Sequence, residues 1–421
     1  MPPHLALIGA GITGTTLSIA LTRRHIPHTV YEQAPHPTEL GAGLGFGPNA
    51  ARAMAIADPV LGAGETEPVW IEFLDGTADG GGVFAGFGEG HGAVHRAKWL
   101  GVLLGMVPGG VVQFGKRLEG VERLGGKVVL RFGDGTTAEA DAVVGCDGVK
   151  SKVREIMVGG GEVEGARCGY SGKYAYRCMI PRELALEELG IERVEVSSLG
   201  MGHGRHVLTF PVGKPGGEQF LNLVAFVTDA NKSWPSQDTK SFTLPATMED
   251  ALRDFEQRGF SKTIQKLLHL TKDKMDKWGL FDMADHPLPK FYSDGILVIG
   301  DAAHASTPHH GSGAGFCMED VAVLASLLEE IHGCDVEPYD GLHEVFAAFD
   351  ESRGERDQWL VHSSRRAAEL YQWRLPDTGK EHFEAMRRDV ETRQAVCWGI
   401  DLEKVIQEAR VDLRRRRRAA K

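Results

Sequence analysis

Three stretches of the chain combine glycines with an acidic residue in a way that suits a phosphorylated cofactor. Gly9, Gly11 and Gly14 form a Gly-x-Gly-x-x-Gly sequence, which is followed after roughly 20 residues by Glu32. In this pattern the glycines let backbone amides approach a pyrophosphate, and the acid accepts hydrogen bonds from a ribose. The stretch therefore indicates a dinucleotide site, but it does not distinguish NAD from FAD.

The other two stretches each end an apolar run with an aspartate, Asp147 and Asp301. Asp301 is followed by a glycine-rich loop and by apolar residues at helical spacing from Cys317. Backbone amides at the start of such a helix can stabilise negative charge. We expect this loop, with Gly313, Ala314 and Gly315, to face the reactive part of the cofactor.

Arg177 is the candidate for binding a substrate. It lies in the strand-like segment 173–180, and its guanidinium stays charged at any working pH, so it could hold a phenolate or a carboxylate. A structural salt bridge on a sheet face is an equally weighted alternative. His304 is interpreted as a histidine that orients the loop after Asp301. His309 and His310 have no acidic partner at a metal-ligand spacing, so no metal site is expected.

The elements that must position these residues alternate in the manner of an α/β protein. Short buried strands are predicted at 5–8, 29–32, 142–145 and 296–299, with helices between them. Between about 167 and 285 alternating apolar residues predict an antiparallel sheet. We therefore expect a Rossmann-like dinucleotide-binding domain from 1–75, 92–165 and 286–356, an inserted antiparallel β-sheet domain at 166–285, and C-terminal helices with a basic tail at 357–421.

Composition narrows the function classes. The net charge of -11 argues against a general nucleic-acid binder. No apolar run is long enough to cross a bilayer and the N-terminus lacks the pattern of a signal peptide, so a soluble, cytoplasmic protein is expected. The six cysteines contain no CxxC pair, which favours reduced thiols. The five arginines at 414–418 are interpreted as a solvated tail.

Together these motifs resemble those of the group A flavin-dependent monooxygenases, the p-hydroxybenzoate hydroxylase type, and within them the salicylate hydroxylase-like branch. The segment 9–14 with Glu32 resembles the family's ADP-binding motif, 146–154 its DG motif, and 300–304 with Pro308 its GD motif. The three occur in the family's order, and the resemblance spans residues 5 to about 356.

The resemblance implies an enzyme that uses FAD, NADH or NADPH, and O2, through a C4a-hydroperoxyflavin, to hydroxylate a small aromatic, phenolic or polyketide-like substrate. It implies a catalytic or substrate-orienting role for Arg177. Several phenol-hydroxylating relatives have Tyr-Pro where this chain has Phe210 and Pro211, so Phe210 is a departure at the substrate site. The residues implied to bind FAD are Gly9, Gly11, Gly14, Glu32, Gly45, Arg96, Asp147, Asp301, Gly313, Ala314 and Gly315.

Other functions remain open at this point. The same cofactor chemistry could epoxidise an alkene or an indole in secondary metabolism, and Phe210 leaves room for such a less acidic substrate. A flavoprotein oxidase or dehydrogenase is a further alternative. A non-enzymatic binding protein with a vestigial nucleotide domain is disfavoured, because all three nucleotide motifs are intact.

Overall fold

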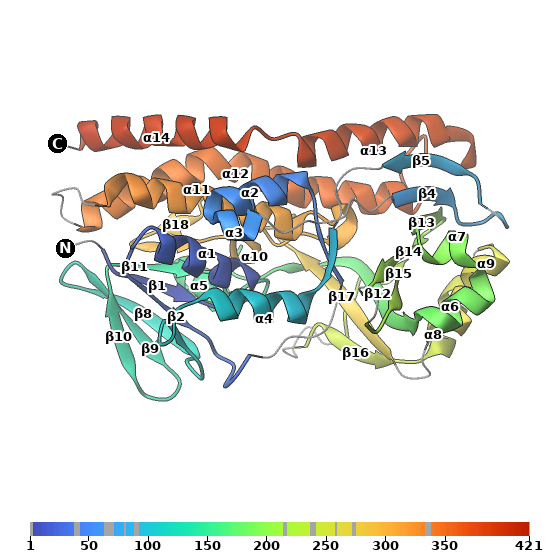
Figure 1. Ribbon diagram of the computed structural model, residues 1–421, viewed down its shortest axis with the longest axis horizontal. Coiled ribbons are helices and arrows are strands. Elements are labelled where there is room, and N and C mark those ends of the chain that lie inside the picture. Colours follow the sequence, from blue (N-terminus) through green and yellow to red (C-terminus); the bar gives the residue numbers. More distant parts are fainter. Residues whose placement is uncertain are drawn as a thin grey trace.

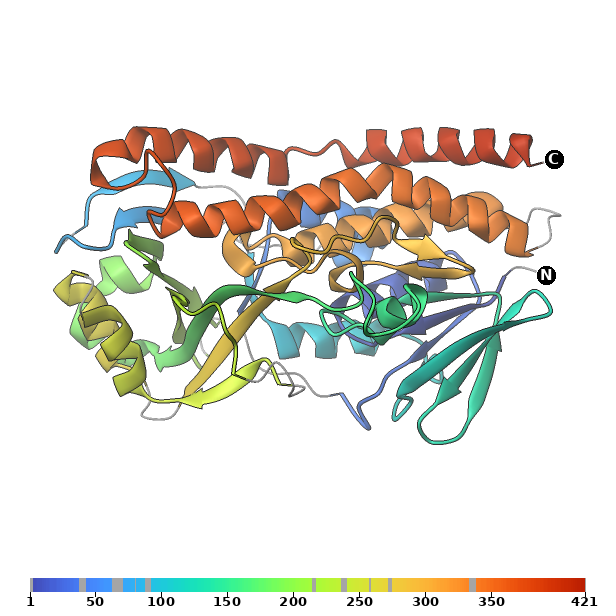
Figure 2. The ribbon, with the colours of Figure 1, turned by 180° about the vertical axis from the view of Figure 1, so that it is seen from behind.

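Two large sheets, joined by long helices, organise the chain (Figure 1). The computed structural model describes residues 3–37, 43–62, 71–79, 81–87, 92–213, 217–235, 241–256, 259–271, 275–332 and 338–420. The helices of the C-terminal region lie along one side of the molecule and extend past both sheets (Figures 1 and 2). The expected mixed α/β architecture with a second sheet and a helical C-terminal region is confirmed.

The six-stranded sheet has the order β18-β19-β11-β1-β2-β7 and is parallel except at its β18 edge. Its strands are β1 (Leu5–Ile8), β2 (His28–Tyr31), β7 (Val112–Gln113), β11 (Ala142–Gly145), β18 (Tyr292–Ser293) and β19 (Ile296–Val298). Every residue of β1, β11 and β19 is buried, as expected for a parallel sheet that helices cover. The carboxyl ends of these three strands lead directly into the three glycine–acid stretches.

Helices pack around this sheet and start close to its carboxyl edge. The longest of them, α11, is apolar on all sides and is buried almost throughout its length. The helices are α1 (Ile12–Arg23), α2 (Pro48–Ala57), α3 (Pro59–Gly62), α4 (Arg96–Met106), α5 (Lys152–Met157), α10 (Asp301–His304) and α11 (Gly313–Ile331).

The eight-stranded sheet has the order β16-β17-β12-β15-β14-β13-β4-β5 and is antiparallel except between β13 and β4. One face packs on four helices through side chains such as Tyr176, Leu223, Phe255 and Leu268. The strands are β4 (Ile71–Asp75), β5 (Val83–Phe87), β12 (Gly169–Pro181), β13 (Ser197–Gly202), β14 (Arg205–Val212), β15 (Phe220–Thr228), β16 (Thr243–Ala246) and β17 (Met275–Asp282), and the helices are α6 (Arg182–Leu189), α7 (Ile191–Val194), α8 (Met248–Glu256) and α9 (Lys262–His269).

Two features depart from the domain boundaries expected from the sequence. Strand β4 comes from the segment 1–75 but belongs to the eight-stranded sheet, where it pairs with β13 more than a hundred residues later. The boundary after residue 356 falls inside one continuous helix, α12 (Pro338–Tyr371). The cofactor-side segment and the C-terminal helices are therefore joined without a break in the backbone.

Two smaller sheets complete the β-structure. The hairpin β8 (Leu118–Leu124) and β9 (Lys127–Phe132) extends to β10 (Thr137–Ala140), and β3 (Gly43–Phe46) pairs with β6 (Gly92–His95). Gly125 and Gly126 form the turn between β8 and β9, and both residues have positive φ, of 56° and 85°.

The C-terminal region continues from α12 through the short helix η2 (Lys380–His382) to α13 (Phe383–Trp398) and α14 (Leu402–Ala419). The arginine run lies in α14, and Arg414 and Arg416 form ion pairs with Glu330 and Asp412. None of the described helices has both the length and the apolar character that crossing a bilayer requires.

Candidate active site

A single large cavity of about 1850 Å³ runs from the carboxyl edge of the six-stranded sheet to one face of the eight-stranded sheet. It is large for a small-molecule pocket, so it can hold a dinucleotide together with a second ligand. Its lining includes eleven of the residues predicted from the sequence: Gly9, Gly11, Glu32, Gly45, Arg96, Asp147, Arg177, Phe210, Asp301, Gly313 and Ala314. The two other predicted residues, Gly14 and Gly315, are not part of the lining.

The first glycine turn is built for close contacts. Gly9 has a φ of 101°, and a Cβ there would lie 2.7 Å from the Cys146 carbonyl oxygen. A Cβ at Gly14 would lie 2.0 Å from the Gly9 oxygen, so Gly14 lets α1 approach the turn. A Cβ at Gly11 would meet nothing within 4 Å, because this N-cap of α1 faces open space. No acidic side chain occupies the first turn of α1, so the backbone amides there suit an anion.

Glu32, which follows strand β2, forms hydrogen bonds that hold the first glycine turn in place. Its carboxylate accepts hydrogen bonds from the backbone N–H groups of Ala10 and Ala34, both at 2.8 Å. Each carboxylate oxygen keeps a further lone pair on the cavity side. Glu32 can therefore hold the shape of the turn and also accept hydrogen bonds from a ligand such as a ribose.

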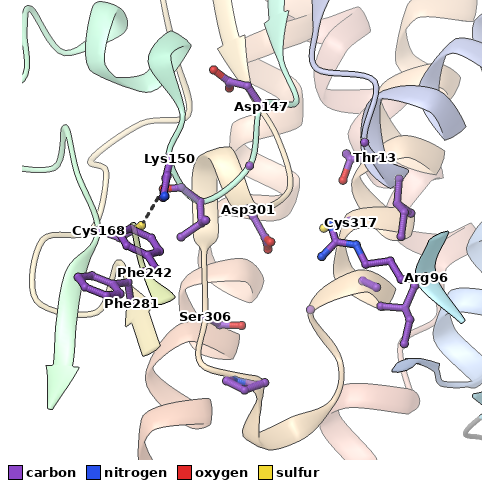
Figure 3. Close-up of a pocket in the computed structure, with 18 of the residues that line it drawn as sticks. Thr13, Arg96, Asp147, Lys150, Cys168, Phe242, Phe281, Asp301, Ser306 and Cys317 are labelled. Atoms are coloured by element: carbon purple, nitrogen blue, oxygen red, sulfur yellow. Dashed lines mark hydrogen bonds between the residues drawn. The ribbon is translucent and has the colours of Figure 1, made fainter. Parts of the chain in front are cut away.

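Asp147 and Asp301 differ sharply in their surroundings. The Asp147 carboxylate accepts hydrogen bonds from Ser151 Oγ at 2.5 Å and from the backbone N–H groups of Lys152 and Val153 at 2.7 and 3.0 Å. It therefore caps helix α5, and burial raises its pKa. Asp301 is exposed at the start of α10. In Figure 3 its carboxylate points into the cavity, whereas that of Asp147 points away from it.

The start of α11 offers a second set of backbone amides. Its N-cap, Ser312, donates its hydroxyl to the His310 carbonyl at 3.1 Å instead of capping the helix, and the first turn contains no acidic residue. Gly313 and Ala314 line the cavity. Gly315 faces α2, where a Cβ would lie 2.9 Å from Asn49 Nδ2. The amides of this first turn have no partner within the helix, so they can stabilise a ligand's negative charge.

The eight-stranded sheet supplies the opposite wall of the cavity. Side chains alternate along its strands, so one set packs on the helices and the other faces the cavity. The cavity set is mostly apolar and includes Leu208, Phe210, Val224, Phe226 and Leu280. Asn222 is also in this wall and is buried.

Arg177 is the cation of this wall. It lies in β12 opposite Val224, and its guanidinium carbon is 5.1 Å from the centre of the Trp278 ring. Its Nε is buried without a hydrogen-bond partner, and no carboxylate of the described residues forms an ion pair with it. Burial, together with the charge of Arg96, lowers the pKa of Arg177 to about 10, so it remains charged at neutral pH. The alternative role of a structural salt bridge therefore lacks its partner in the described part of the chain.

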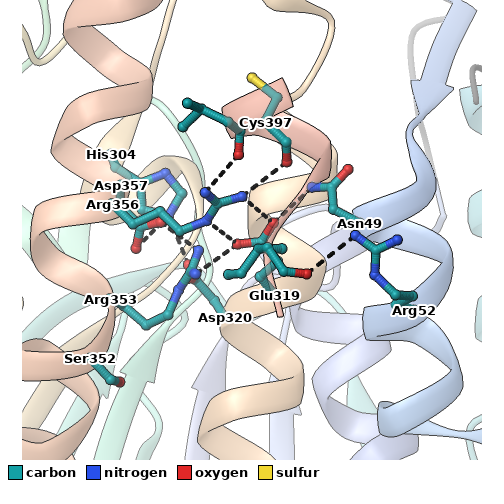
Figure 4. A network of polar contacts seen from close by, with 12 residues as sticks. Asn49, Arg52, His304, Glu319, Asp320, Ser352, Arg353, Arg356, Asp357 and Cys397 are labelled. Atoms are coloured by element: carbon teal, nitrogen blue, oxygen red, sulfur yellow. Dashed lines mark hydrogen bonds and ion pairs between the residues drawn. The ribbon is translucent and has the colours of Figure 1, made fainter. Parts of the chain in front are cut away.

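Behind α11 lies a buried network of charged residues that the sequence reasoning did not find (Figure 4). Asp320 accepts hydrogen bonds from the Gly300 N–H at 2.8 Å, from His304 Nε2 at 2.7 Å and from Arg353 Nε at 2.8 Å. Glu319 binds Asn49, Arg353 and Arg356. The network ties the loop that carries Asp301 to α11, α12 and α2, and the contact of His304 with Asp320 agrees with its interpretation as a residue that orients this loop. The feature of the sequence that could have revealed this network is the pair of acidic residues, Glu319 and Asp320, inside an apolar helix.

His304, Asp320 and Asp357 lie close enough together to share one cation. The guanidinium of Arg353 already binds both of these carboxylates, with contacts of 2.8 Å to Asp320 and 2.5 Å to Asp357. Burial alone would lower the pKa of His304, but the charges of Asp357 and Asp320 raise it to about 9. The cluster is therefore balanced by its own cations.

Comparisons with known proteins agree with this geometry. A family model described as an FAD binding domain matches residues 191–334. The FAD-dependent monooxygenase orf3 of Aspergillus niger is 39% identical over 96% of this chain and 95% of its own. The salicylate hydroxylase asL1 of Sarocladium schorii is 33% identical over 97% of this chain and 90% of its own. The dual trans-enoyl reductase/FAD-dependent monooxygenase tazHJ of Aspergillus terreus is longer, and the chain spans 60% of it at 36% identity.

Among solved structures, a salicylate hydroxylase in complex with its substrate superimposes with a TM-score of 0.81. It is 28% identical in sequence, and the match covers 97% of this chain and 98% of the other. The glycine turns, the two open helix N-termini and the extended cavity all fit FAD as the cofactor.

Proposed function

Because the chain belongs to the FAD-dependent monooxygenases of the salicylate hydroxylase type, we propose that it uses NADH or NADPH and O2 to hydroxylate a small phenolic or polyketide-like aromatic substrate in secondary metabolism. One observation carries the proposal. Arg177 places a positive charge with no ion-pair partner among the described residues on a mostly apolar wall of the cavity. A buried cation of this kind suits an anionic ligand oxygen.

FAD, when bound, supplies the chemistry that activates oxygen. The backbone amides beside Gly11 would hold its pyrophosphate, Glu32 its adenosine ribose and Asp301 its ribityl chain. The open amides of Gly313 and Ala314 would stabilise negative charge on the flavin ring, as donors preorganised at a helix N-terminus. Gly45 and Arg96 would line the side of the cofactor. Gly14 and Asp147 would contribute by shaping the turns and helices around it.

The eight-stranded sheet would hold the substrate against the ring. Arg177 would bind the substrate as its phenolate, which is the electron-rich form of a phenol and the one that reacts with an electrophilic oxygen. Leu208, Val224 and Phe226 would exclude water from the reacting atoms. These residues would position and shield the substrate.

Phe210 supports a second candidate, the epoxidation of an alkene or an indole. Its ring supplies no hydroxyl for a phenolate, so this part of the wall also suits a less acidic substrate. The third candidate, an oxidase or dehydrogenase, would oxidise its substrate without adding an oxygen atom.

The test combines a substrate panel with a variant of the wall. Wild-type protein, NAD(P)H, O2 and a set of phenols should yield a product that has gained one oxygen atom, detected by mass spectrometry. Arg177→Ala should lower kcat/KM by about 10- to 100-fold, the value of a hydrogen-bonded charge, while the flavin absorbance of the purified protein is retained. Arg253→Ala, at an exposed site on α8, is the matched control. Unchanged turnover in Arg177→Ala would leave that arginine a purely structural role, and a product without added oxygen would favour the oxidase.

A further inference from the structure

One imidazole of the cavity has no partner for either of its nitrogens. His309 lies in the short helix η1 (Pro308–His310), immediately before α11, and lines the cavity. Its side chain is only 7% exposed, yet neither Nδ1 nor Nε2 forms a hydrogen bond with any described residue. The next residue, His310, forms a hydrogen bond of 2.8 Å with Ser363 Oγ. A buried polar group without a partner costs about 1–3 kcal/mol, so two such atoms at a cavity wall indicate a missing ligand.

Neighbouring rings fix the position of His309. Its ring centre lies 5.0 Å from that of Phe226 and 5.2 Å from that of His206, and His206 stacks on Phe226 at 4.3 Å. Phe226 and Val224 face the cavity from the same strand, and Val224 is the residue opposite Arg177. Residues two apart on a strand are separated by about 7 Å. His309 and Arg177 therefore lie beside adjacent positions of one wall of the cavity.

The charge state of His309 limits what it can bind. Burial, together with the nearby groups of His206 and Lys173, lowers its pKa well below the usual value, so the ring is neutral at working pH. A neutral imidazole donates one hydrogen bond and accepts another. It complements a hydroxyl or a carbonyl oxygen better than it complements a second carboxylate.

We propose that His309 is a second substrate-binding residue, which hydrogen-bonds a neutral oxygen substituent while Arg177 binds the anionic oxygen of the same ring. The inference rests on the function proposed above and sharpens its substrate class. The substrate is a phenol that carries a further hydroxyl or carbonyl group on the ring.

The experiment measures binding to the FAD-loaded protein without turnover. Phenol, the three dihydroxybenzenes, the three hydroxybenzaldehydes and the three hydroxybenzoates are titrated anaerobically, and the change in flavin absorbance gives each Kd. In the wild type at least one dihydroxybenzene or hydroxybenzaldehyde should bind about 3- to 10-fold more tightly than phenol, the value of one hydrogen bond. The hydroxybenzoates should gain less.

Variants identify the residue responsible. His309→Ala should remove that preference and leave the Kd of phenol within twofold of the wild-type value. His309→Gln keeps a donor and an acceptor, so it should restore most of the preference. His203→Ala, at an exposed turn of the same sheet, should change nothing.

Three results would overturn the proposal. The first is an unchanged preference in His309→Ala, and the second is a wild type that binds phenol as tightly as its oxygenated analogues. The third is a folded His309→Ala protein that has lost its flavin, which would assign the residue to the cofactor. If no phenol changes the flavin spectrum or the rate of NAD(P)H oxidation in the wild type, the proposed function fails as well, independently of residue 309.

Discussion

At the scale of single residues, the two aspartates that end buried strands have different surroundings. All the hydrogen bonds found for the Asp147 carboxylate come from the start of α5, whereas Asp301 presents its carboxylate to the cavity. Both follow a short apolar run and adjoin a glycine, so the sequence pattern is the same. What separates them is the direction of the side chain: Asp147 points to the start of the following helix α5, whereas Asp301 is itself the first residue of α10.

This difference predicts opposite effects of the same substitution. Asp301→Ala should reduce FAD affinity at least tenfold and leave the melting temperature of the apoprotein unchanged, because its side chain forms no hydrogen bond with the described part of the chain that could be lost. Asp147→Ala should lower the stability of the apoprotein by about 1–2 kcal/mol through loss of a helix cap. Flavin fluorescence titration and thermal unfolding of both variants test this. Full retention of FAD by Asp301→Ala would refute the assignment of that residue.

At the scale of elements, helix α11 connects the cavity to the buried charge network. Its N-terminus faces the cavity, and the residues two turns later, Glu319 and Asp320, hold the loop of His304 and the helix α12. The orientation of the open amides is thus fixed by ion pairs deep in the protein. A buried network of ion pairs such as this one stabilises the fold only while each of its residues keeps its charge.

The network predicts a pH dependence of stability. The folded-state pKa of His304, about 9, exceeds the value of about 6.5 expected in an unfolded chain. Its contribution is therefore complete below pH 6.5 and is lost as the pH rises through 9. We expect the melting temperature of the FAD-loaded wild type to fall across this window by more than that of His304→Gln. Parallel curves for the two proteins would show that the histidine does not carry the effect.

Local patterns in the sequence predicted the elements and missed the contacts between them. The strands β1, β11 and β19 and the glycine turns were predictable because periodicity and turn chemistry act over a few residues. The placement of β4 beside β13 was not, because the partners are far apart in sequence. Likewise, eleven predicted site residues meet at one cavity. The hydrogen-bond partners of Asp320 were not predictable, because they come from two other segments and no local sequence pattern pairs them with Asp320.

At the scale of the whole molecule, α14 packs against the helices α2, α11 and α12. It buries Ile406, Ala409 and Leu413, and Arg410 and Arg414 pair with acids at the end of α11. Part of the arginine run, which is predicted to be a solvated tail, therefore forms ion pairs within the fold. Charge alone could not indicate this, because Glu330, which pairs with Arg414, is 84 residues away in the chain.

A pair of substitutions on α14 tests how much the packing of this helix stabilises the fold. Leu413 is fully buried and Val411 is 63% exposed on the same helix. Leu413→Ala should destabilise the protein by about 2–4 kcal/mol, as in other buried leucine truncations, and Val411→Ala by less than about 0.5 kcal/mol. Thermal or urea unfolding of the two variants measures the difference. Equal stability of both would mean that α14 contributes little to the fold.

Helix α12 has a consequence for how this active site can change. With 34 residues it is about 51 Å long. In its first half, Arg353 binds Asp320 of α11, which accepts hydrogen bonds from the loop of Gly300 and His304. At its other end Glu369, and Gln372 just after the helix, bind Lys173 of the eight-stranded sheet. One continuous helix therefore links the two sheets and fixes the distance between them. Natural or directed evolution can then alter which ring is accepted by exchanging side chains such as Leu208, Phe210 and Val224, while the machinery that holds the flavin is inherited unchanged.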